Sequence, residues 1–207
     1  MEKNRAAANN LSFNERLRVL FHPITGWFGR QGARLGINPD VVSLAGFGFV
    51  LVAAWLAASG NILLSGIVLI PGFLLDTIDG AIARAAKRNN NFGPLLDSTL
   101  DRYADGFIFC GLAYYYASQG QMNESALAML ALIGAFVVSY VRARAEGLGI
   151  GSIKTGWFDR FIRSVILAVA LVTGWVVPGL LILAVGTHLT ALQRLVIGYR
   201  ETHLDHN

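Results

Sequence analysis

Four aspartates with helical spacing are the residues of this sequence best suited to chemistry. Asp76 and Asp79 lie three positions apart, and Asp97 and Asp101 lie four apart, so each pair shares one face of a helix. Both pairs stand next to long apolar runs, where an ionisable group is costly and suggests a function. The short basic turn 85–92 joins the two helices, so we expect them to run antiparallel as neighbours and to bring all four carboxylates together. Divalent cations with oxygen ligands, Mg²⁺ or Mn²⁺, would offset these four negative charges. We therefore predict that all four aspartates hold metal ions.

Other interpretations of these carboxylates remain open at this point. A single aspartate near a helix end can cap the helix or pair with a nearby cation, and the candidates here are Arg84, Lys87, Arg88 and Arg102. An ion-coupled transporter could use the same chemistry, and a structural membrane subunit would need the aspartates only for stability. Two pairs at matched helical spacing favour a metal site over helix caps.

Small residues and one arginine accompany the aspartate pairs. Gly80 and Ala83 follow the first pair and Gly93 precedes the second, so a flat ligand could approach the backbone closely. Arg84 can hold a phosphate through two parallel hydrogen bonds. Acidic, small and basic residues in this order suggest a metal-bridged diphosphate that carries a nucleoside.

The whole pattern resembles the signature of the CDP-alcohol phosphotransferases. All eight fixed positions match in Asp76-x2-Asp79-Gly80-x2-Ala83-Arg84-x8-Gly93-x3-Asp97-x3-Asp101. The resemblance implies a six-span, often dimeric enzyme that transfers a phosphatidyl or related group from a CDP-alcohol, such as CDP-diacylglycerol, to an acceptor hydroxyl and releases CMP. It also implies a two-metal site with Asp101 as general base. Gly80, Ala83, Arg84 and Gly93 would then surround the CDP group.

A second basic group suggests that the acceptor carries a phosphate. Arg160 and Arg163 share a helix face, and together with Arg142, Arg144 and Arg194 they could form a phosphate clamp. Charge flanking a membrane span would explain any one of these arginines equally well. The arrangement resembles the bacterial phosphatidylinositol-phosphate synthases, which implies inositol 1-phosphate as the acceptor. The alternative is a phosphatidylglycerol-phosphate synthase, which uses glycerol 3-phosphate.

The resemblance to these synthases continues before the first apolar run. The segment Asn38-Pro39-Asp40-Val41-Val42-Ser43 looks like their donor-contacting segment, so Asp40 and Ser43 are predicted CDP contacts. Asn90 is a further predicted CDP contact, at a position where those synthases often have a hydroxyl residue. The pair Phe161-Ile162 departs from them, because they tend to have Pro-Glu there.

Membrane helices must position these residues. The chain is 54% hydrophobic and only 14% charged, against about 25% charged in a soluble domain, which excludes an ordinary soluble enzyme. No Asp, Glu, Lys or Arg occurs in 41–75, 106–123, 125–141 or 164–193, and one crossing takes about 20 apolar residues. We predict an all-α integral membrane protein with six spans, near 41–58, 62–83, 97–117, 125–145, 161–175 and 178–197. The breaks within the long runs are expected near 59–61 and 174–179, where small and turn-forming residues gather.

The basic residues predict the orientation. Six spans place all 17 Lys and Arg on one face, which the positive-inside rule assigns to the cytoplasm together with both termini and the carboxylate site. The excess over the 13 Asp and Glu therefore reflects anionic lipid headgroups, and we expect no nucleic acid partner. The N-terminus lacks the pattern of a secretory signal, and we expect the plasma membrane of a prokaryote.

Two further features complete the predicted organisation. Residues 11–36 mix apolar and basic side chains, which is typical of an amphipathic segment lying along the membrane interface. No linker or internal repeat divides the chain, so we expect one domain over residues 1–207. A single cysteine, Cys110, excludes an intrachain disulfide and a cysteine-based metal site.

Overall fold

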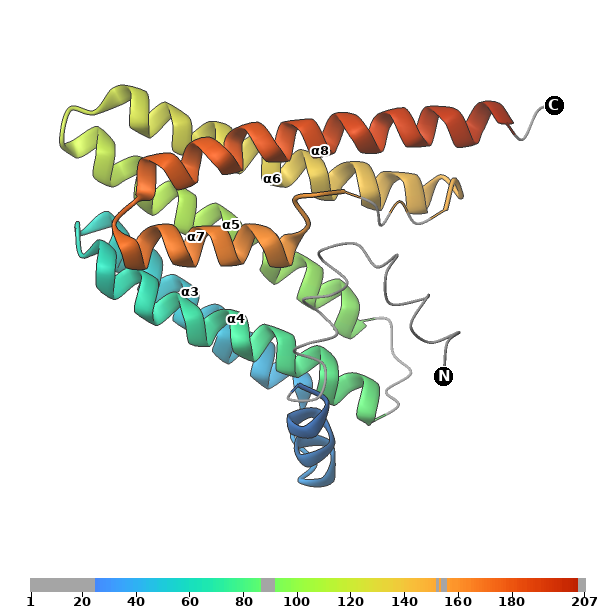
Figure 1. Cartoon of the computed structure of the whole chain (residues 1–207). Coiled ribbons are helices and arrows are strands. Elements are labelled where there is room, and N and C mark those ends of the chain that lie inside the picture. The colour runs from blue at the N-terminus through green and yellow to red at the C-terminus, as the bar shows by residue number, and fades with distance from the viewer. Residues whose placement is uncertain (1–24, 87–91, 152, 154–155, 205–207) are drawn as a thin grey trace, which may run out of the picture.

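The computed structural model describes residues 25–86, 92–151, 153 and 156–204. All regular secondary structure in this part of the chain is helical, so the all-α prediction is confirmed. A helical segment at 25–34 precedes the six helices of Figure 1: α3 (Pro39–Ala58), α4 (Ile62–Ala85), α5 (Phe92–Ser118), α6 (Met122–Gly147), α7 (Arg160–Thr173) and α8 (Val176–Leu204). One helix lies over each predicted span, although α7 ends two residues before the predicted span 161–175 does.

Helix ends form where the local sequence favours them. Asn38 caps α3, since its side chain accepts a hydrogen bond of 3.0 Å from the amide of Asp40. At the other end of the bundle, α7 stops at Gly174, whose φ of 77° is a left-handed conformation that suits glycine. The break before α8 is shorter than predicted, because Pro178 lies inside the first turn of α8. Proline fits there, since amides of a first turn have no partner within the helix.

The six helices form two packed pairs with two bridging helices. α3 packs against α4, and α6 packs against α8. α5 contacts α3 and α6, whereas α7 contacts α4 and α8, so α5 and α7 each join the two pairs (Figure 1). Buried Leu69, Leu112, Leu171 and Leu180 are part of the shared apolar core.

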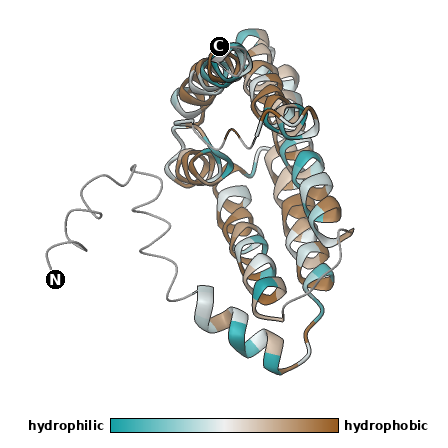
Figure 2. Cartoon of the chain, turned by 90° about the vertical axis from the view of Figure 1, so that its right-hand side faces the viewer, coloured by the Kyte–Doolittle hydropathy of each residue, from teal (hydrophilic) through white to brown (hydrophobic). Residues whose placement is uncertain are grey.

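Four of these helices are long and apolar enough to cross a membrane: α3, α4, α6 and α8. Many large apolar side chains point outward, among them Trp55, Leu63 and Leu189, which are each more than half exposed. Figure 2 shows hydrophobic positions all along the helices, including their outer faces. An apolar outer surface of this extent is what a helix bundle presents to lipid.

The other two helices depart from a standard span for different reasons. α7 has 14 residues and is about 21 Å long, against roughly 30 Å of hydrocarbon. α5 is long enough, but its first half carries the charged residues Asp97, Asp101, Arg102 and Asp105. These are also the helices that carry the candidate chemistry.

The predicted amphipathic segment is described only from residue 25 onward, and residues 11–24 lie outside the described part. The helical segment 25–34 packs tightly against the end of α4. A Cβ on Gly29 would lie 2.8 Å from the Ala81 backbone, and a Cβ on Gly32 would lie 2.7 Å from the Ile82 side chain. Figure 1 accordingly places this segment beside the C-terminal end of α4.

Candidate active site

Three of the four predicted metal ligands converge in the structure. Asp76 comes from α4, and Asp97 and Asp101 come from α5; one oxygen of each lies within 4.8 Å of the other two. Asp101 is buried, and the other two are half-buried. Three carboxylates at this separation form a hard, oxygen-only donor set, which fits a divalent cation such as Mg²⁺ or Mn²⁺.

The packing that creates this cluster differs from the sequence expectation. α4 and α5 were expected to be close antiparallel neighbours, but each packs mainly against α3. The carboxylates therefore face one another across a space that residues of α3 line on one side. They do not lie in a tight contact between α4 and α5. This arrangement leaves a small cavity of about 20 Å³ beside Asp76, Asp97 and Asp101, enough for an ion or a water molecule and too small for a nucleotide.

The fourth aspartate, Asp79, lies slightly apart. It is 4% exposed, and the hydroxyl of Ser43 on α3 donates a hydrogen bond of 2.5 Å to its carboxylate. Ser43 was predicted to contact CDP, and the structure places it as a partner of Asp79. The bond fixes the direction in which Asp79 presents its second oxygen.

Arg160 joins the carboxylate cluster from the start of α7. Its guanidinium makes two parallel contacts with Asp76, of 2.7 and 2.8 Å, and lies 2.6 Å from Oδ1 of Asp101. That Oδ1 atom is buried and receives no hydrogen bond of good geometry from the described residues. The two acids on different helices are thus held by one cation, and Asp101 keeps an oxygen with spare acceptor capacity.

The other predicted acceptor arginines are distributed around this centre. Arg163 and Arg194 are 4% and 3% exposed; Arg163 pairs with Asp105 at 3.0 Å, and Arg194 donates to the backbone carbonyl of Val138 at 2.7 Å. Arg142 and Arg144 are exposed at the end of α6. The charges of Arg142 and Arg163 act on Arg194, so these three arginines form one basic region beside the cluster.

The predicted CDP contacts occupy the ends of the helices near the carboxylates. Asp40 is in the first turn of α3, and Gly93 is in the first turn of α5. Arg84 folds back along α4, so that a Cβ on Gly80 would lie 3.2 Å from its guanidinium. Ala83 is half-buried on the same helix. Asn90 lies outside the described residues.

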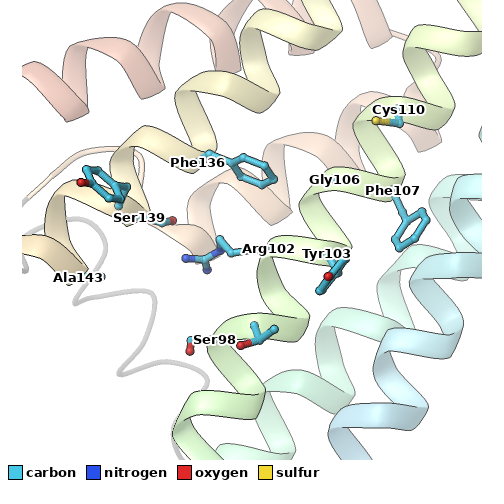
Figure 3. Close-up of a pocket in the computed structure, with 11 residues that line it drawn as sticks. Ser98, Arg102, Tyr103, Gly106, Phe107, Cys110, Phe136, Ser139 and Ala143 are labelled. Atoms are coloured by element: carbon cyan, nitrogen blue, oxygen red, sulfur yellow. The ribbon is translucent and has the colours of Figure 1, made fainter.

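A larger cavity of about 780 Å³ opens between α5 and α6 (Figure 3). Tyr103, Phe107 and Phe136 line it, and Figure 3 shows Arg102 beside them. Arg102 lies 3.3 Å from the carboxylate of Asp101, so the cavity begins next to the cluster. Its lining is mainly apolar, unlike that of the carboxylate site.

One charged residue at the site was missed by sequence reasoning. Asp105 lies four positions after Asp101 and faces Arg163, which lies three positions after Arg160. The signal was present, because two acids one turn apart and two arginines one turn apart can form two ion pairs between two helices. Asp105 is not one of the eight residues of the signature, so the signature does not predict a role for it.

A helical bundle of membrane type with a cluster of carboxylates at one end fits a metal-binding membrane protein. The sequence model of the CDP-alcohol phosphatidyltransferase family matches residues 37–193. The chain belongs to this family, and its activity is that of a CDP-alcohol phosphatidyltransferase.

Named relatives share most of the chain. It is 36% identical to archaetidylinositol phosphate synthase of Pyrococcus horikoshii, over 81% of this chain and 86% of that protein. It is 34% identical to phosphatidylinositol phosphate synthase of Streptomyces avermitilis, over 97% of this chain and 89% of that protein.

Solved structures are also similar. The crystal structure of Mycobacterium tuberculosis phosphatidylinositol phosphate synthase with CDP-DAG bound has a TM-score of 0.75 and 30% identity, covering 86% of this chain and 94% of that one. The same protein in complex with manganese and citrate gives a TM-score of 0.73 at 29% identity, covering 84% and 88%. Manganese in a relative with this fold agrees with the oxygen donors of the cluster.

Proposed function

We propose that this chain transfers the phosphatidyl group of CDP-diacylglycerol to a hydroxyl of inositol 1-phosphate. The observation that carries the proposal is the convergence of Asp76, Asp97 and Asp101 with Arg160. It combines a metal-binding donor set with a cation that can hold a phosphate. The names of the similar proteins, which are inositol phosphate synthases, support the acceptor.

Each residue has a role in the proposed reaction. Asp76, Asp79, Asp97 and Asp101 hold two divalent cations, which offset the charge of the diphosphate. Asp101 accepts the proton of the acceptor hydroxyl as its oxygen forms the new bond to phosphorus. The bond from that phosphorus to the CMP oxygen breaks, and CMP leaves with the electron pair.

The substrate contacts complete the assignment. We assign CDP to Asp40, Ser43, Gly80, Ala83, Arg84, Asn90 and Gly93. Arg160 binds the acceptor phosphate. Positive potential around that phosphate comes from Arg142, Arg144, Arg163 and Arg194. Among these arginines, Arg160 has the strongest support, because its guanidinium is already beside Asp101.

The proposal also covers the topology of the chain in the membrane. We infer six crossings with both termini and the site in the cytoplasm, in the plasma membrane of a prokaryote, and one domain over residues 1–207. The ends of α4 and α6 and the starts of α5 and α7, which carry the carboxylates and most of the arginines, lie at the same end of the bundle (Figure 1), and this supports the orientation. The homodimer implied by family resemblance is part of the proposal, and light scattering of the detergent-solubilised protein would test it.

An acceptor panel tests the function directly. Purified protein is incubated with CDP-diacylglycerol, Mg²⁺ or Mn²⁺, and inositol 1-phosphate, glycerol 3-phosphate, serine or free inositol, and CMP release is measured. We expect release with inositol 1-phosphate. Release with glycerol 3-phosphate alone would instead identify a phosphatidylglycerol-phosphate synthase, and activity with only an unphosphorylated alcohol would rule out the phosphate role of the arginines.

A further inference from the structure

We propose that Asp105 is a positioning residue for the transfer reaction. Its ion pair with Arg163 fixes the start of α7 relative to α5, and this holds Arg160 among the carboxylates. Asp105 belongs to none of the donor, acceptor or metal contacts assigned above. The kinetic part of the inference rests on the proposed function, whereas its structural part does not.

Two ion pairs connect α5 and α7 like successive rungs. Asp105 lies one turn beyond Asp101 on α5, and Arg163 lies one turn beyond Arg160 on α7. The outer rung joins Asp101 and Arg160 at 2.6 Å, and the inner rung joins Asp105 and Arg163 at 3.0 Å. The spacing within each helix matches, so fixing the inner rung determines where the outer one falls.

The inner rung is the drier of the two. In the inner pair, the side chains of Arg163 and Asp105 are 5% and 16% exposed. In the outer pair, those of Arg160 and Asp101 are 28% and 9% exposed, so the difference lies in the arginines. A buried charge that loses its partner is left uncompensated, and therefore the two inner side chains strongly favour one arrangement. Arg160 is the more solvent-exposed of the two arginines.

Arg163 also anchors the chain that leads into α7. Its guanidinium reaches the backbone carbonyl of Phe158 at 3.4 Å, next to Asp159, which caps α7 through the amide of Ile162 at 3.1 Å. The amide of Phe158 donates to Thr190 on α8 at 3.2 Å. The entry to α7 is thus tied to α8 by Thr190 and to α5 by the inner ion pair.

The packing of α7 explains why such a tie is needed. Its extensive backbone contacts are with α4 and α8, and neither helix carries Asp97 or Asp101. The acids on α5 and Arg160 on α7 therefore need a separate link to stay in register. Asp105 supplies that link from the same helix as the general base.

The test compares full-length Asp105→Asn with wild type in lipid nanodiscs. We expect the KM for the phosphorylated acceptor to rise at least tenfold, while the KM for CDP-diacylglycerol stays within twofold. Amide hydrogen exchange in peptides covering residues 156–163 should accelerate at least tenfold, with α3 unchanged. Asp105→Glu, which keeps the charge, should bring the acceptor KM back to within about threefold of wild type.

Glu124→Gln is the matched control, because it removes a carboxylate from the first turn of α6, outside the site residues assigned above. It should change neither KM nor the exchange of residues 156–163. An Asn variant with unchanged acceptor KM and exchange would overturn the proposal. So would a uniform acceleration of exchange across all helices with a loss in kcat alone, since that pattern reports general destabilisation.

Two further outcomes are decisive. If Asp105→Asn does not fold, the double variant Asp105→Asn/Arg163→Gln takes its place, because it removes the ion pair without leaving a buried unpaired charge. Faster exchange at residues 156–163 than in wild type then supports the proposal, and identical exchange contradicts it. If wild type releases CMP with no acceptor, the proposed function fails, and the exchange comparison still decides the role of Asp105.

Discussion

Arg160 and a bound cation require the same oxygen atoms. Arg160 occupies both oxygens of Asp76 and approaches Oδ1 of Asp101, and these are predicted metal ligands. A metal ion and a guanidinium also repel each other at such short distances. Binding of metal should therefore weaken the hold of the carboxylates on Arg160 and make its guanidinium available to an acceptor phosphate.

This competition gives a prediction for Arg160→Gln. Without substrates, the variant should bind Mn²⁺ about fivefold or more tightly than wild type, because a competing cation is gone, and a coupling of this size is typical between linked sites. Electron paramagnetic resonance of free Mn²⁺ measures the affinity. Arg142→Gln is the control, since Arg142 pairs with exposed Glu146 on α6. Weaker Mn²⁺ binding in Arg160→Gln would show that Arg160 supports the metal site instead of competing for it.

Asp101 gives a prediction about catalysis. Asp101→Asn keeps the side-chain size but cannot accept the proton of the acceptor hydroxyl, so CMP release should fall by about 100-fold or more. The measurement is CMP release at saturating Mn²⁺, which limits the effect of weakened metal binding. Glu124→Gln should keep full activity, and a fall of less than fivefold in Asp101→Asn would remove the general-base role.

The identity of the site residues was predictable to different degrees. The four signature aspartates were found because helical spacing alone puts each pair on one face. The sequence could not distinguish Arg160 from Arg163, because both lie on the same face of one helix and carry the same charge. Their difference arises from Asp105, whose position opposite Arg163 depends on how α5 and α7 are placed in the bundle.

At the scale of elements, α3 and α4 approach each other closely beside the site. A Cβ on Gly46 would lie 3.1 Å from the carbonyl oxygen of Gly72 and 3.3 Å from the Leu75 side chain. Both glycines line the small cavity next to Asp76. The lack of side chains at these two positions thus sets the distance between α3 and the helix that carries the first aspartate pair.

We expect Gly46→Val to destabilise the protein by about 1–3 kcal/mol, because the added methyl groups must push the helices apart. Its thermal unfolding, followed by tryptophan fluorescence in detergent, should shift to lower temperature. Gly48→Val is a matched control on the same helix, where an added Cβ meets nothing within 4 Å. Equal Tm values for the two variants would show that this contact is not tight in the membrane protein.

The helices themselves were predictable, but their neighbours were not. Runs free of charge gave six ranges, and one helix lies over each. The expectation that α4 and α5 pack directly was wrong, since both pack mainly against α3. Apolar composition determines that a helix forms and is buried or meets lipid, whereas small residues such as Gly46 and Gly72 decide which helices approach closely.

At the scale of the whole molecule, charge and hydropathy separate along the bundle. The turns that precede α4, α6 and α8 contain no Lys or Arg, while the opposite ends of the helices carry Arg84, Arg102, Arg142 and Arg160. Because basic residues are retained on the cytoplasmic side, the carboxylate cluster should face the cytoplasm, where a water-soluble acceptor and a lipid-anchored donor can meet.

Single cysteines test this orientation. Cys110 is replaced by serine, and either Gln119→Cys, in the turn before α6, or Glu201→Cys, near the end of α8, is introduced; both positions are exposed. A maleimide that does not cross membranes should label Gln119→Cys in intact cells and should label Glu201→Cys only after the membrane is opened. The reverse pattern would place the site on the outer face, and labelling of both in intact cells would mean that α6, α7 and α8 do not make three crossings between these positions.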